Sequence, residues 1–377
     1  MLDLEAIRAR IPILRHAIPM NNCSQAPQSD ATRAAAEEYL RSWNEDGMDW
    51  TRWMDEVVAA RAEFADLINA RVDEVAAVSS VSHATSVVAS ALDFRTDRNV
   101  IVASGAEFPT VGHVWLAQRP LGAEVRWVTA RDGVVEPADY LAHIDGRTRI
   151  VSAAHAYFLN GALQDIGAVA RVAHERGAWI FVDAYQSAGV APVDVKAMDV
   201  DFLASGTLKF LMGTPGIAFL YVRPDLIAGL EPRVTGWFGR ASPFAFDATR
   251  LDWSATAARL EAGTPAIFSA YVSRAGMRLL RETGRDEVYA HCRQLGEHIE
   301  REGARLGLQV HGGHAPFGRT TSTGFIVPDA HTVEDRLRAR GVIASARGPV
   351  VRLAPHFYST FDDVDRALRA LRDEAGP

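Results

Sequence analysis

Lysine is almost missing from this chain of 377 residues, although arginine is plentiful. Lysine and arginine together number 40, and only Lys196 and Lys209 are lysines. A genome biased toward arginine codons accounts for this wherever a positive charge suffices. Arginine keeps its proton and forms no Schiff base, whereas a lysine amine can lose its proton and condense with an aldehyde. A lysine that persists under this bias is therefore a candidate for chemistry that arginine cannot perform.

Cysteine, long apolar runs and an excess of basic charge are also lacking. Cys23 and Cys292 are the only cysteines, too few for a disulfide framework, so we expect a reducing cytoplasm. No uncharged run approaches the ~18 apolar residues of a membrane span, and the first residues carry acids where a signal peptide carries bases, so we expect no membrane partner. A net charge of −7 argues against nucleic acid and leaves small molecules as the expected partners.

The first 250 residues alternate helical patterns with short apolar runs. This alternation predicts an α/β fold with a mostly parallel sheet flanked by helices. Asp30 is the expected cap of the first long helix, over residues 31–43. Further helices are expected over 50–68, 137–143 and 166–176, and strands over 99–103, 124–128, 149–153, 179–182, 202–204 and 217–222.

The pattern changes beyond Arg250. Two longer helical patterns follow, with Pro265 at the start of the first, where proline is tolerated. We therefore expect a large domain over residues 15–250 and a smaller C-terminal α/β domain over 251–377, with residues 1–14 packed nearby. In the smaller domain, helices are expected over 266–282, 286–305 and 361–373, and strands over 323–327 and 350–353.

Lys209 follows the apolar run 202–204 in the segment Asp201-Phe-Leu-Ala-Ser-Gly-Thr-Leu-Lys209. A lysine between two apolar strands, among small and hydroxylic residues, can be partly desolvated, which lowers its pKa toward the nucleophilic range. The alternative is a surface lysine, which the apolar neighbours and the scarcity of lysine disfavour. Lys196 lies between acids and fits a solvated position better.

Asp183 ends the apolar run of residues 179–182, where open α/β sheets place ligand-binding residues. Taken alone, this aspartate is equally well explained as a cap for a turn. Together with Lys209 it predicts a site for a pyridine ring that acts as an electron sink. A carboxylate keeps the pyridine nitrogen protonated while a lysine holds the aldehyde carbon.

Two further segments carry groups suited to anions. Residues 79–86 open a helical pattern with five hydroxyls, which suits a phosphate, although an ordinary serine-rich cap is as good an interpretation. Arg352 lies in an apolar strand, where an unpaired guanidinium is costly to bury. A substrate carboxylate or a structural salt bridge would offset that cost, and the sequence does not choose between them.

These residues resemble the class V aminotransferase superfamily, the fold-type I pyridoxal 5′-phosphate (PLP) enzymes that include cysteine desulfurases, kynureninases and isopenicillin N epimerase-like proteins. The resemblance runs from about residue 20 to 372. It is most specific over Asp201–Val222, which is similar to the family's DF…K.L.G..G..FLYV pattern. The resemblance implies a large PLP-binding domain, a smaller C-terminal domain, and a Schiff base between PLP and Lys209.

The resemblance also implies roles for other residues. Asp183 and Gln186 match the aspartate that pairs with the pyridine nitrogen and the glutamine near the phenolic oxygen. Residues 107–110 resemble the kynureninase-type EFPS segment, whose aromatic residue, here Phe108, stacks on the ring. Ser82 and His83 match the start of the family's phosphate-binding helix, and Thr264 matches the threonine of its GTP segment. Arg352 matches the arginine that binds the substrate's α-carboxylate. Because the family's threonine approaches the phosphate from the partner subunit, Thr264 implies a homodimer with a shared active site.

The chain departs from the family pattern in two places. The serine and histidine that many relatives carry before the lysine are Gly206 and Leu208 here, so Ser205 or Thr207 would have to supply phosphate contacts. Residues 344–349 contain no cysteine, whereas desulfurases need a nucleophilic thiol in this loop. The departure argues against a desulfurase.

The reaction type stays open within this resemblance. We expect an α-amino acid substrate, no metal site, and a PLP-dependent lyase that cleaves a carbon–sulfur bond by β-elimination. An aminotransferase, or an epimerase, of the same superfamily is the alternative. In all of these reactions the cofactor accepts the electrons of the broken bond, and the orientation of the substrate selects which bond breaks. A catalytically inactive PLP-fold binding module is the alternative from another class.

Overall fold

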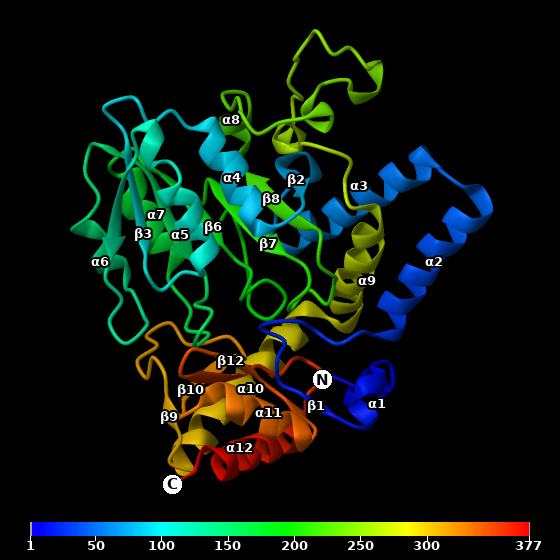
Figure 1. Cartoon of the computed structure of the whole chain (residues 1–377), viewed down its shortest axis with the longest axis vertical. Coiled ribbons are helices and arrows are strands. Elements are labelled where there is room, and N and C mark those ends of the chain that lie inside the picture. Colours follow the sequence, from blue (N-terminus) through cyan, green and yellow to red (C-terminus); the bar gives the residue numbers. More distant parts are fainter. Residues whose placement is uncertain (1, 377) are drawn as a thin grey trace.

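A seven-stranded sheet forms the centre of the larger part of the molecule in the computed structural model, which describes residues 2–376 (Figure 1). Its strands lie in the order β2 (Val75–Val78), β8 (Ala218–Val222), β7 (Phe202–Gly206), β6 (Trp179–Asp183), β5 (Thr148–Ala154), β3 (Val100–Ser104) and β4 (Glu124–Val128). The five strands from β7 to β4 run parallel, and β8 is antiparallel to both of its neighbours. The predicted mostly parallel α/β sheet is confirmed, and all six predicted strands belong to it.

Helices cover both faces of this sheet. Phe64 of α3 (Trp50–Leu67) and Val169 of α7 (Ile166–His174) belong to the hydrophobic core on one face. Val88 of α4 (Val81–Ala91) and Trp115 of α5 (Pro109–Leu116) belong to the core on the other. Burial on both faces explains why most of the strands read as continuous apolar runs. A short helix, α6 (Pro137–Leu141), precedes β5.

The helix expected over residues 31–43 is α2 (Asp30–Asp46), and its cap differs from the prediction. Ser29 is the N-cap, because its hydroxyl accepts from the Thr32 amide while the Thr32 hydroxyl accepts from the Ser29 amide. Asp30 instead lies in the first helical turn and pairs with Arg10. Helix α9 (Ile267–Thr283) packs against α2 and α3, so it lies with the larger part of the molecule.

The C-terminal part is a second layer of sheet and helices below the first (Figure 1). Its sheet is antiparallel, in the order β12 (Ser345–Arg347), β13 (Val350–Leu353), β10 (Thr323–Ile326) and β9 (Gln309–Val310). Its helices are α10 (Arg285–Arg305), α11 (Ala330–Ala339) and α12 (Phe361–Ala375). A separate apolar core that includes Phe325, Leu337 and Leu368 lies between them, as expected for a smaller α/β domain.

The N-terminal segment packs on the C-terminal part. Arg8 in α1 (Leu4–Ala9) donates to the Tyr358 carbonyl at 2.9 Å and to Asp363 at 2.6 Å. Strand β1 (Ile18–Pro19) then pairs in parallel with β11 (Val342–Ile343). The chain therefore crosses from the C-terminal part to the large sheet directly after β1, and this crossing carries Cys23 and Ser24 past the carboxyl ends of the strands.

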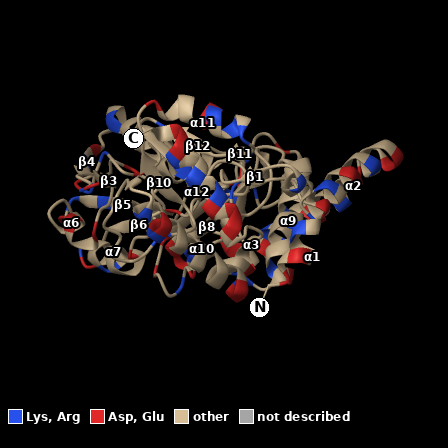
Figure 2. Ribbon diagram, turned by 90° about the horizontal axis from the view of Figure 1, so that it is seen from below, with Lys and Arg blue, Asp and Glu red and all other residues tan. Residues whose placement is uncertain are grey.

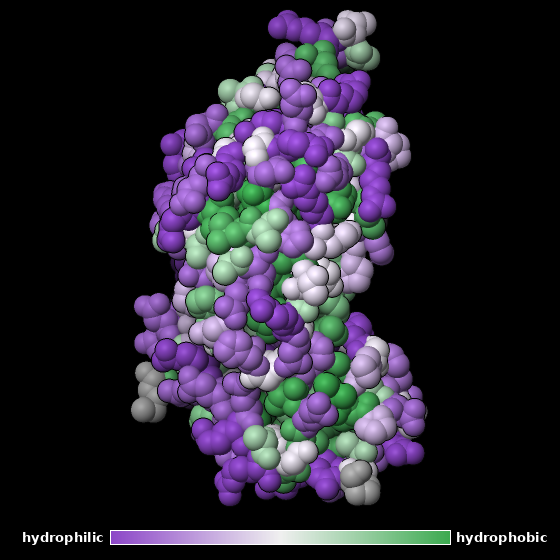
Figure 3. Space-filling model, turned by 90° about the vertical axis from the view of Figure 1, so that its left-hand side faces the viewer, coloured by the Kyte–Doolittle hydropathy of each residue, from purple (hydrophilic) through white to green (hydrophobic). Residues whose placement is uncertain are grey.

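Seen from below, basic and acidic positions are interspersed along the ribbon (Figure 2), and a space-filling view shows a waist between the larger and smaller parts (Figure 3). An irregular segment between α8 (Pro224–Ile227) and α9 rises above the body in Figure 1 and exposes Phe244 and Phe246. No helix within residues 2–376 is long and apolar enough to cross a membrane.

Candidate active site

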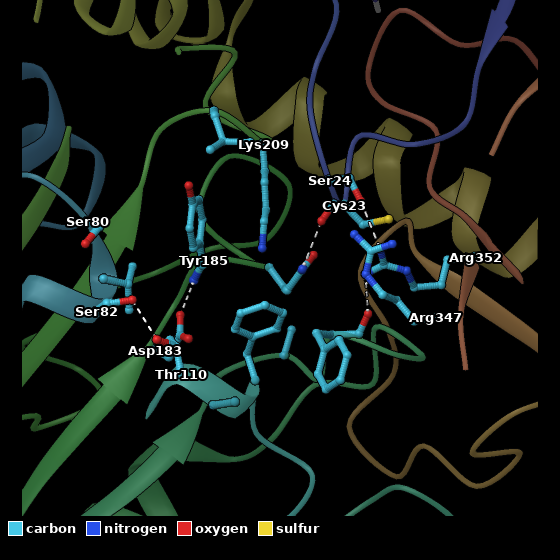
Figure 4. Close-up of a pocket in the computed structure, with 17 residues that line it drawn as sticks. Cys23, Ser24, Ser80, Ser82, Thr110, Asp183, Tyr185, Lys209, Arg347 and Arg352 are labelled. Atoms are coloured by element: carbon cyan, nitrogen blue, oxygen red, sulfur yellow. Dashed lines mark hydrogen bonds between the residues drawn. The ribbon is translucent and has the colours of Figure 1, made fainter. Parts of the chain in front are cut away.

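A cavity of about 220 Å³ opens where the carboxyl ends of the parallel strands meet the C-terminal part. Strands β3, β5, β6 and β7 each end at this edge, which is where open α/β sheets hold their ligands. The lining residues labelled in Figure 4 are Cys23, Ser24, Ser80, Ser82, Thr110, Asp183, Tyr185, Lys209, Arg347 and Arg352. The hydroxyls of Ser80, Ser82 and Thr110 gather at one end of the cavity, whereas Ser24 and the two guanidinium groups lie at the other, with the Lys209 amine between the two ends (Figure 4).

Lys209 lies in the loop after β7 and points its amine into the cavity (Figure 4). Its Nζ lies 4.0 Å from the centre of the Tyr185 ring and 5.5 Å from that of Phe108. Burial lowers the pKa of this amine to about 8, with Arg352 and Arg347 acting in the same direction and Asp183 against it. A far larger fraction of Lys209 than of an ordinary lysine is therefore neutral and nucleophilic near neutral pH.

Asp183 is the last residue of β6 and is buried. Its Oδ1 accepts a hydrogen bond of 2.8 Å from the Tyr185 amide, which fixes the carboxylate toward the cavity. Burial raises the pKa of Asp183, an effect that the Tyr185 amide and the charge of Lys209 oppose. Within the part of the chain that the structure describes, no arginine or lysine forms an ion pair with this carboxylate, so a cationic ring nitrogen is a suitable partner.

Phe108 is presented by a tight turn after β3. Glu107 anchors this turn by accepting from the Ser104 amide at 2.9 Å and from the Ser152 hydroxyl at 2.7 Å. Phe108 then caps α5 and is 41% exposed, with its ring edge-to-face against Phe158 at 5.3 Å. An exposed aromatic face at the wall of a cavity is available for stacking on a planar ligand.

Arg352 is buried in β13, yet all of its hydrogen-bond partners are neutral. Its guanidinium donates to the Phe158 carbonyl at 2.9 Å and to the hydroxyls of Ser24 and Ser345 at 2.8 Å each. Within residues 2–376 no carboxylate pairs with Arg352, so the structural salt bridge considered from the sequence is not formed. The uncompensated buried charge favours an anion in the cavity.

The opposite end of the cavity contains hydroxyl groups at the start of α4. Ser80 is the N-cap of this helix, and its hydroxyl accepts from the His83 amide. Ser82 follows within the first turn and shares a hydrogen bond of 2.6 Å with Thr110. Free backbone amides at a helix start and neighbouring hydroxyls are suited to a phosphate.

The structure brings Lys209, Asp183, Gln186, Phe108, Ser82 and Arg352 together at this cavity. Gln186 donates from Nε2 to the Cys23 carbonyl at 3.1 Å, and its buried Oε1 has no partner within the described chain. His83 and Thr264 do not line the cavity. They line a neighbouring one of about 260 Å³, where His83 Nδ1 lies 3.1 Å from the Ser79 hydroxyl.

Ser205 and Thr207 also point away from the cavity, contrary to the expectation that one of them supplies phosphate contacts. The buried Ser205 hydroxyl donates to the Gly206 carbonyl at 3.0 Å. The Thr207 hydroxyl is bonded to Ser273 at 2.7 Å and to the Thr214 carbonyl at 3.2 Å. The alternation of side chains along β7 and the following turn explains why neither hydroxyl reaches the ligand side.

Sequence reasoning missed several residues that line the cavity. Ser80 and Thr110 lie inside segments that the sequence singled out, and Tyr185 lies between Asp183 and Gln186, so their neighbours were an available signal. Cys23, Ser24 and Arg347 carried no local signal, because long-range packing alone brings them to Lys209.

The chain belongs to the aminotransferase class-V family, whose model matches residues 23–366. It is 36% identical over 372 residues to an uncharacterized aminotransferase, YcbU, of Bacillus subtilis (strain 168), covering 97% of this chain and 96% of that protein. It is also 30% identical to a kynureninase of Pseudomonas fluorescens, over 93% of this chain and 87% of the relative. The apo structure of a cysteine desulfurase from Thermococcus onnurineus NA1 superposes with a TM-score of 0.89 at 22% identity, covering 100% of this chain and 98% of that one.

Family membership makes this chain a PLP-dependent enzyme, and the cavity fits that cofactor. Lys209 and Asp183 both face the cavity and suit the aldehyde carbon and the ring nitrogen, which lie at opposite ends of a pyridine ring. Phe108 offers a stacking face, and the hydroxyls at the start of α4 suit the phosphate.

Proposed function

We propose that this enzyme holds PLP through a covalent bond to Lys209 and acts on an α-amino acid. When bound, PLP supplies an aldehyde carbon for the amines of lysine and substrate, and an electron sink for the bond that breaks at Cα. Asp183 is proposed to hold the proton on the ring nitrogen, because a buried carboxylate favours a cation beside it. Gln186 is proposed to lie near the phenolic oxygen, Phe108 to stack on the ring, and Ser82 to contact the phosphate.

Arg352 orients the substrate in this proposal. Its guanidinium, anchored by Ser24 and Ser345, grips the α-carboxylate at the end of the cavity opposite the hydroxyl groups. That grip sets the direction of the Cα–H bond. Lys209 would then be the base that takes the proton from Cα, since its pKa of about 8 suits proton transfer near neutral pH.

The reaction that we favour is β-elimination with cleavage of a carbon–sulfur bond. The observation that carries this choice is the balance of charge in the cavity. Among the described residues that line it, Asp183 is the one carboxyl group, whereas Lys209, Arg347 and Arg352 are cations. No lining acid is left at the substrate end to protonate a poor leaving group, and a thiolate leaves without one, because a thiol has a pKa of about 8.5.

A cysteine does line the cavity, and this bears on desulfurase activity. Cys23 is 1% exposed, in contrast to a thiol that must carry sulfur to an outside acceptor. Residues 344–349 contain no cysteine. We therefore propose that sulfur leaves with the departing thiol and is not transferred to the protein.

The test is a product balance with S-methyl-L-cysteine and L-cystine as substrates. Elimination consumes one water and gives one pyruvate, one ammonia and one thiol or persulfide per amino acid, and we expect these in equal amounts. Pyruvate is followed with lactate dehydrogenase and sulfur with a thiol reagent. Release of alanine in place of pyruvate would contradict the elimination.

An aminotransferase is the second candidate, supported by the relative that is 36% identical and named an uncharacterized aminotransferase. It predicts that L-alanine and a 2-keto acid exchange their amino groups without release of ammonia. The same incubations therefore separate the two candidates. An epimerase would return the substrate as a racemate, and an inactive binding module would leave every substrate unchanged whether or not Lys209 is replaced.

The uptake of PLP by the apo-protein should depend on pH through Lys209. The amine must be neutral to attack the aldehyde, and burial lowers its pKa from 10.5 to about 8. The uptake rate is expected to rise about tenfold per pH unit below pH 8 and to level off above it. Stopped-flow absorbance between pH 6 and 10 measures this. A tenfold rise per unit continuing beyond pH 9 would indicate a solvated lysine instead.

We further propose that the enzyme is a homodimer. Trp237, Phe244 and Phe246 form an aromatic cluster on the raised segment, and Phe246 is 74% exposed, which is costly unless another surface covers it. Thr264 lies two residues after Ala262, whose carbonyl accepts from the Phe238 amide at the base of this segment. It lies outside the Lys209 cavity, as expected if it serves the partner's phosphate.

Sedimentation velocity tests the dimer. Wild-type protein should sediment at twice the chain mass, and Phe246→Asp should shift the population toward monomer. Leu141→Asp is the matched control, because Leu141 is also exposed, at 52%, but lies on α6 away from the raised segment. A monomeric wild-type protein, or equal dissociation by both variants, would overturn this proposal.

A further inference from the structure

The ring of Tyr185 occupies the space that a side chain at position 206 would fill. A Cβ built on Gly206 would stand 2.2 Å from Cζ of Tyr185 and 2.3 Å from its hydroxyl oxygen. Such distances are far inside van der Waals contact, so residue 206 has to be glycine while Tyr185 stays in place. Tyr185 and Gly206 are therefore a matched pair, and the tyrosine hydroxyl lies where a hydroxyl carried by residue 206 would begin.

The Tyr185 hydroxyl is available to a ligand. Tyr185 lines the cavity, and the polar group beside its hydroxyl is the backbone amide of Leu208, which is a donor, so the proton of the hydroxyl is left for a ligand. Burial raises the pKa of this phenol, so it keeps its proton at neutral pH and can donate a hydrogen bond. The backbone amide of Tyr185 donates to Asp183, so the tyrosine backbone and the carboxylate are held together in the turn after β6.

The geometry of PLP indicates which part of the cofactor meets this hydroxyl. The aldehyde carbon and the ring nitrogen lie across the ring from each other, so Lys209 and Asp183 define one axis. The phosphate arm and the phenolic oxygen extend to opposite sides of that axis. The guanidinium of Arg352 lies on one side, and Tyr185 and the serines at the start of α4 lie on the other (Figure 4).

We infer that the Tyr185 hydroxyl donates a hydrogen bond to the phosphate of PLP, in place of a side-chain hydroxyl at residue 206. This inference rests on the proposed function, because it takes the cofactor to be bound at Lys209. Neither Ser205 nor Thr207 can supply the contact, since both hydroxyls are committed elsewhere. Tyr185 is thus a cofactor-binding residue.

The test compares PLP with pyridoxal, which has the same ring and aldehyde but no phosphate. Apo-protein is titrated with each, and binding is followed by absorbance and by quenching of tryptophan fluorescence, without turnover. Tyr185→Phe keeps the ring against Gly206 and removes only the hydroxyl. It should weaken PLP binding about tenfold and leave pyridoxal binding within about twofold of wild type. Equal weakening of both ligands, or of neither, would overturn the inference.

A double variant tests the same contact from the other residue. Tyr185→Ala opens space at position 206, so adding Gly206→Ser to it should recover most of the lost PLP affinity and none of the pyridoxal affinity. Gly206→Ser alone should disturb the cavity, because the serine meets the tyrosine ring. If the double variant has the melting temperature of Tyr185→Ala but does not recover PLP affinity, the inference is contradicted. Failure of wild-type protein to bind PLP would instead contradict the proposed function.

Discussion

Lys209→Ala should abolish the visible absorption of the PLP-loaded enzyme and lower turnover by roughly 10²–10⁴-fold. Two effects of the amine disappear together in this variant: the covalent hold on the cofactor and the transfer of the Cα proton. Lys209 is partly buried and forms no ion pair within residues 2–376, so its removal should leave the melting temperature near that of wild type. Absorbance spectra and steady-state kinetics at saturating PLP measure both losses.

Lys196→Ala is the matched control, because Lys196 is the one other lysine in the chain. It follows Asp194, whose side chain accepts from the Lys196 backbone amide, and its side chain is not part of the cavity. This variant should keep the spectrum and the activity of wild type. A Lys209→Ala enzyme that retains the visible band and at least half of its activity would refute the assignment.

Arg352→Gln should lower kcat/KM for amino acids on the order of 10²-fold. Loss of one partner from a buried, hydrogen-bonded charge pair costs about 3 kcal/mol, which corresponds to that factor. The loss should appear mainly with the substrate, because Arg352 lies at the end of the cavity away from the hydroxyl groups proposed for the phosphate. Kinetics with the amino acid and a parallel titration with PLP separate the two effects.

Arg347→Gln is the control at the same end of the cavity. Arg347 is exposed and donates within its own turn, to the Ala346 carbonyl, so its loss should cost much less than that of Arg352. Arg352→Lys should recover little activity, because an ammonium group cannot reproduce the planar fork of a guanidinium. If Arg352→Gln weakened PLP binding as much as it lowered kcat/KM, a grip on the substrate carboxylate would be the wrong role for this arginine.

The large sheet was predictable because its strands are buried on both faces. The run 217–222 is continuously apolar, the run 149–153 has an apolar centre, and both form strands of this sheet. The strand Val75–Val78 was missed, since its four residues are mostly small and directly precede the serine-rich start of α4. The two- and three-residue strands of the C-terminal part are too short to show the alternation of apolar and polar residues that predicts a strand.

The candidate site was predictable where a reactive side chain stands at, or directly after, the end of a predicted strand. Asp183 ends a strand and Lys209 follows one, so the common edge of a parallel sheet brings them together without knowledge of the tertiary packing. Ser24 was not predictable, because it reaches Arg352 only through the pairing of β1 with β11. The fit of Tyr185 against Gly206 is likewise a property of packing, between the turn after β6 and the end of β7, that no sequence pattern contains.

Reduction of the PLP-loaded enzyme with borohydride, followed by peptide mass spectrometry, shows which lysine carries the cofactor. Borohydride makes a bond between PLP and a lysine permanent, and this chain offers two lysines for comparison. We expect one phosphopyridoxyl group per chain on the peptide that contains Lys209, and an unmodified Lys196. A label on Lys196 instead, or no label on either lysine, would contradict this expectation.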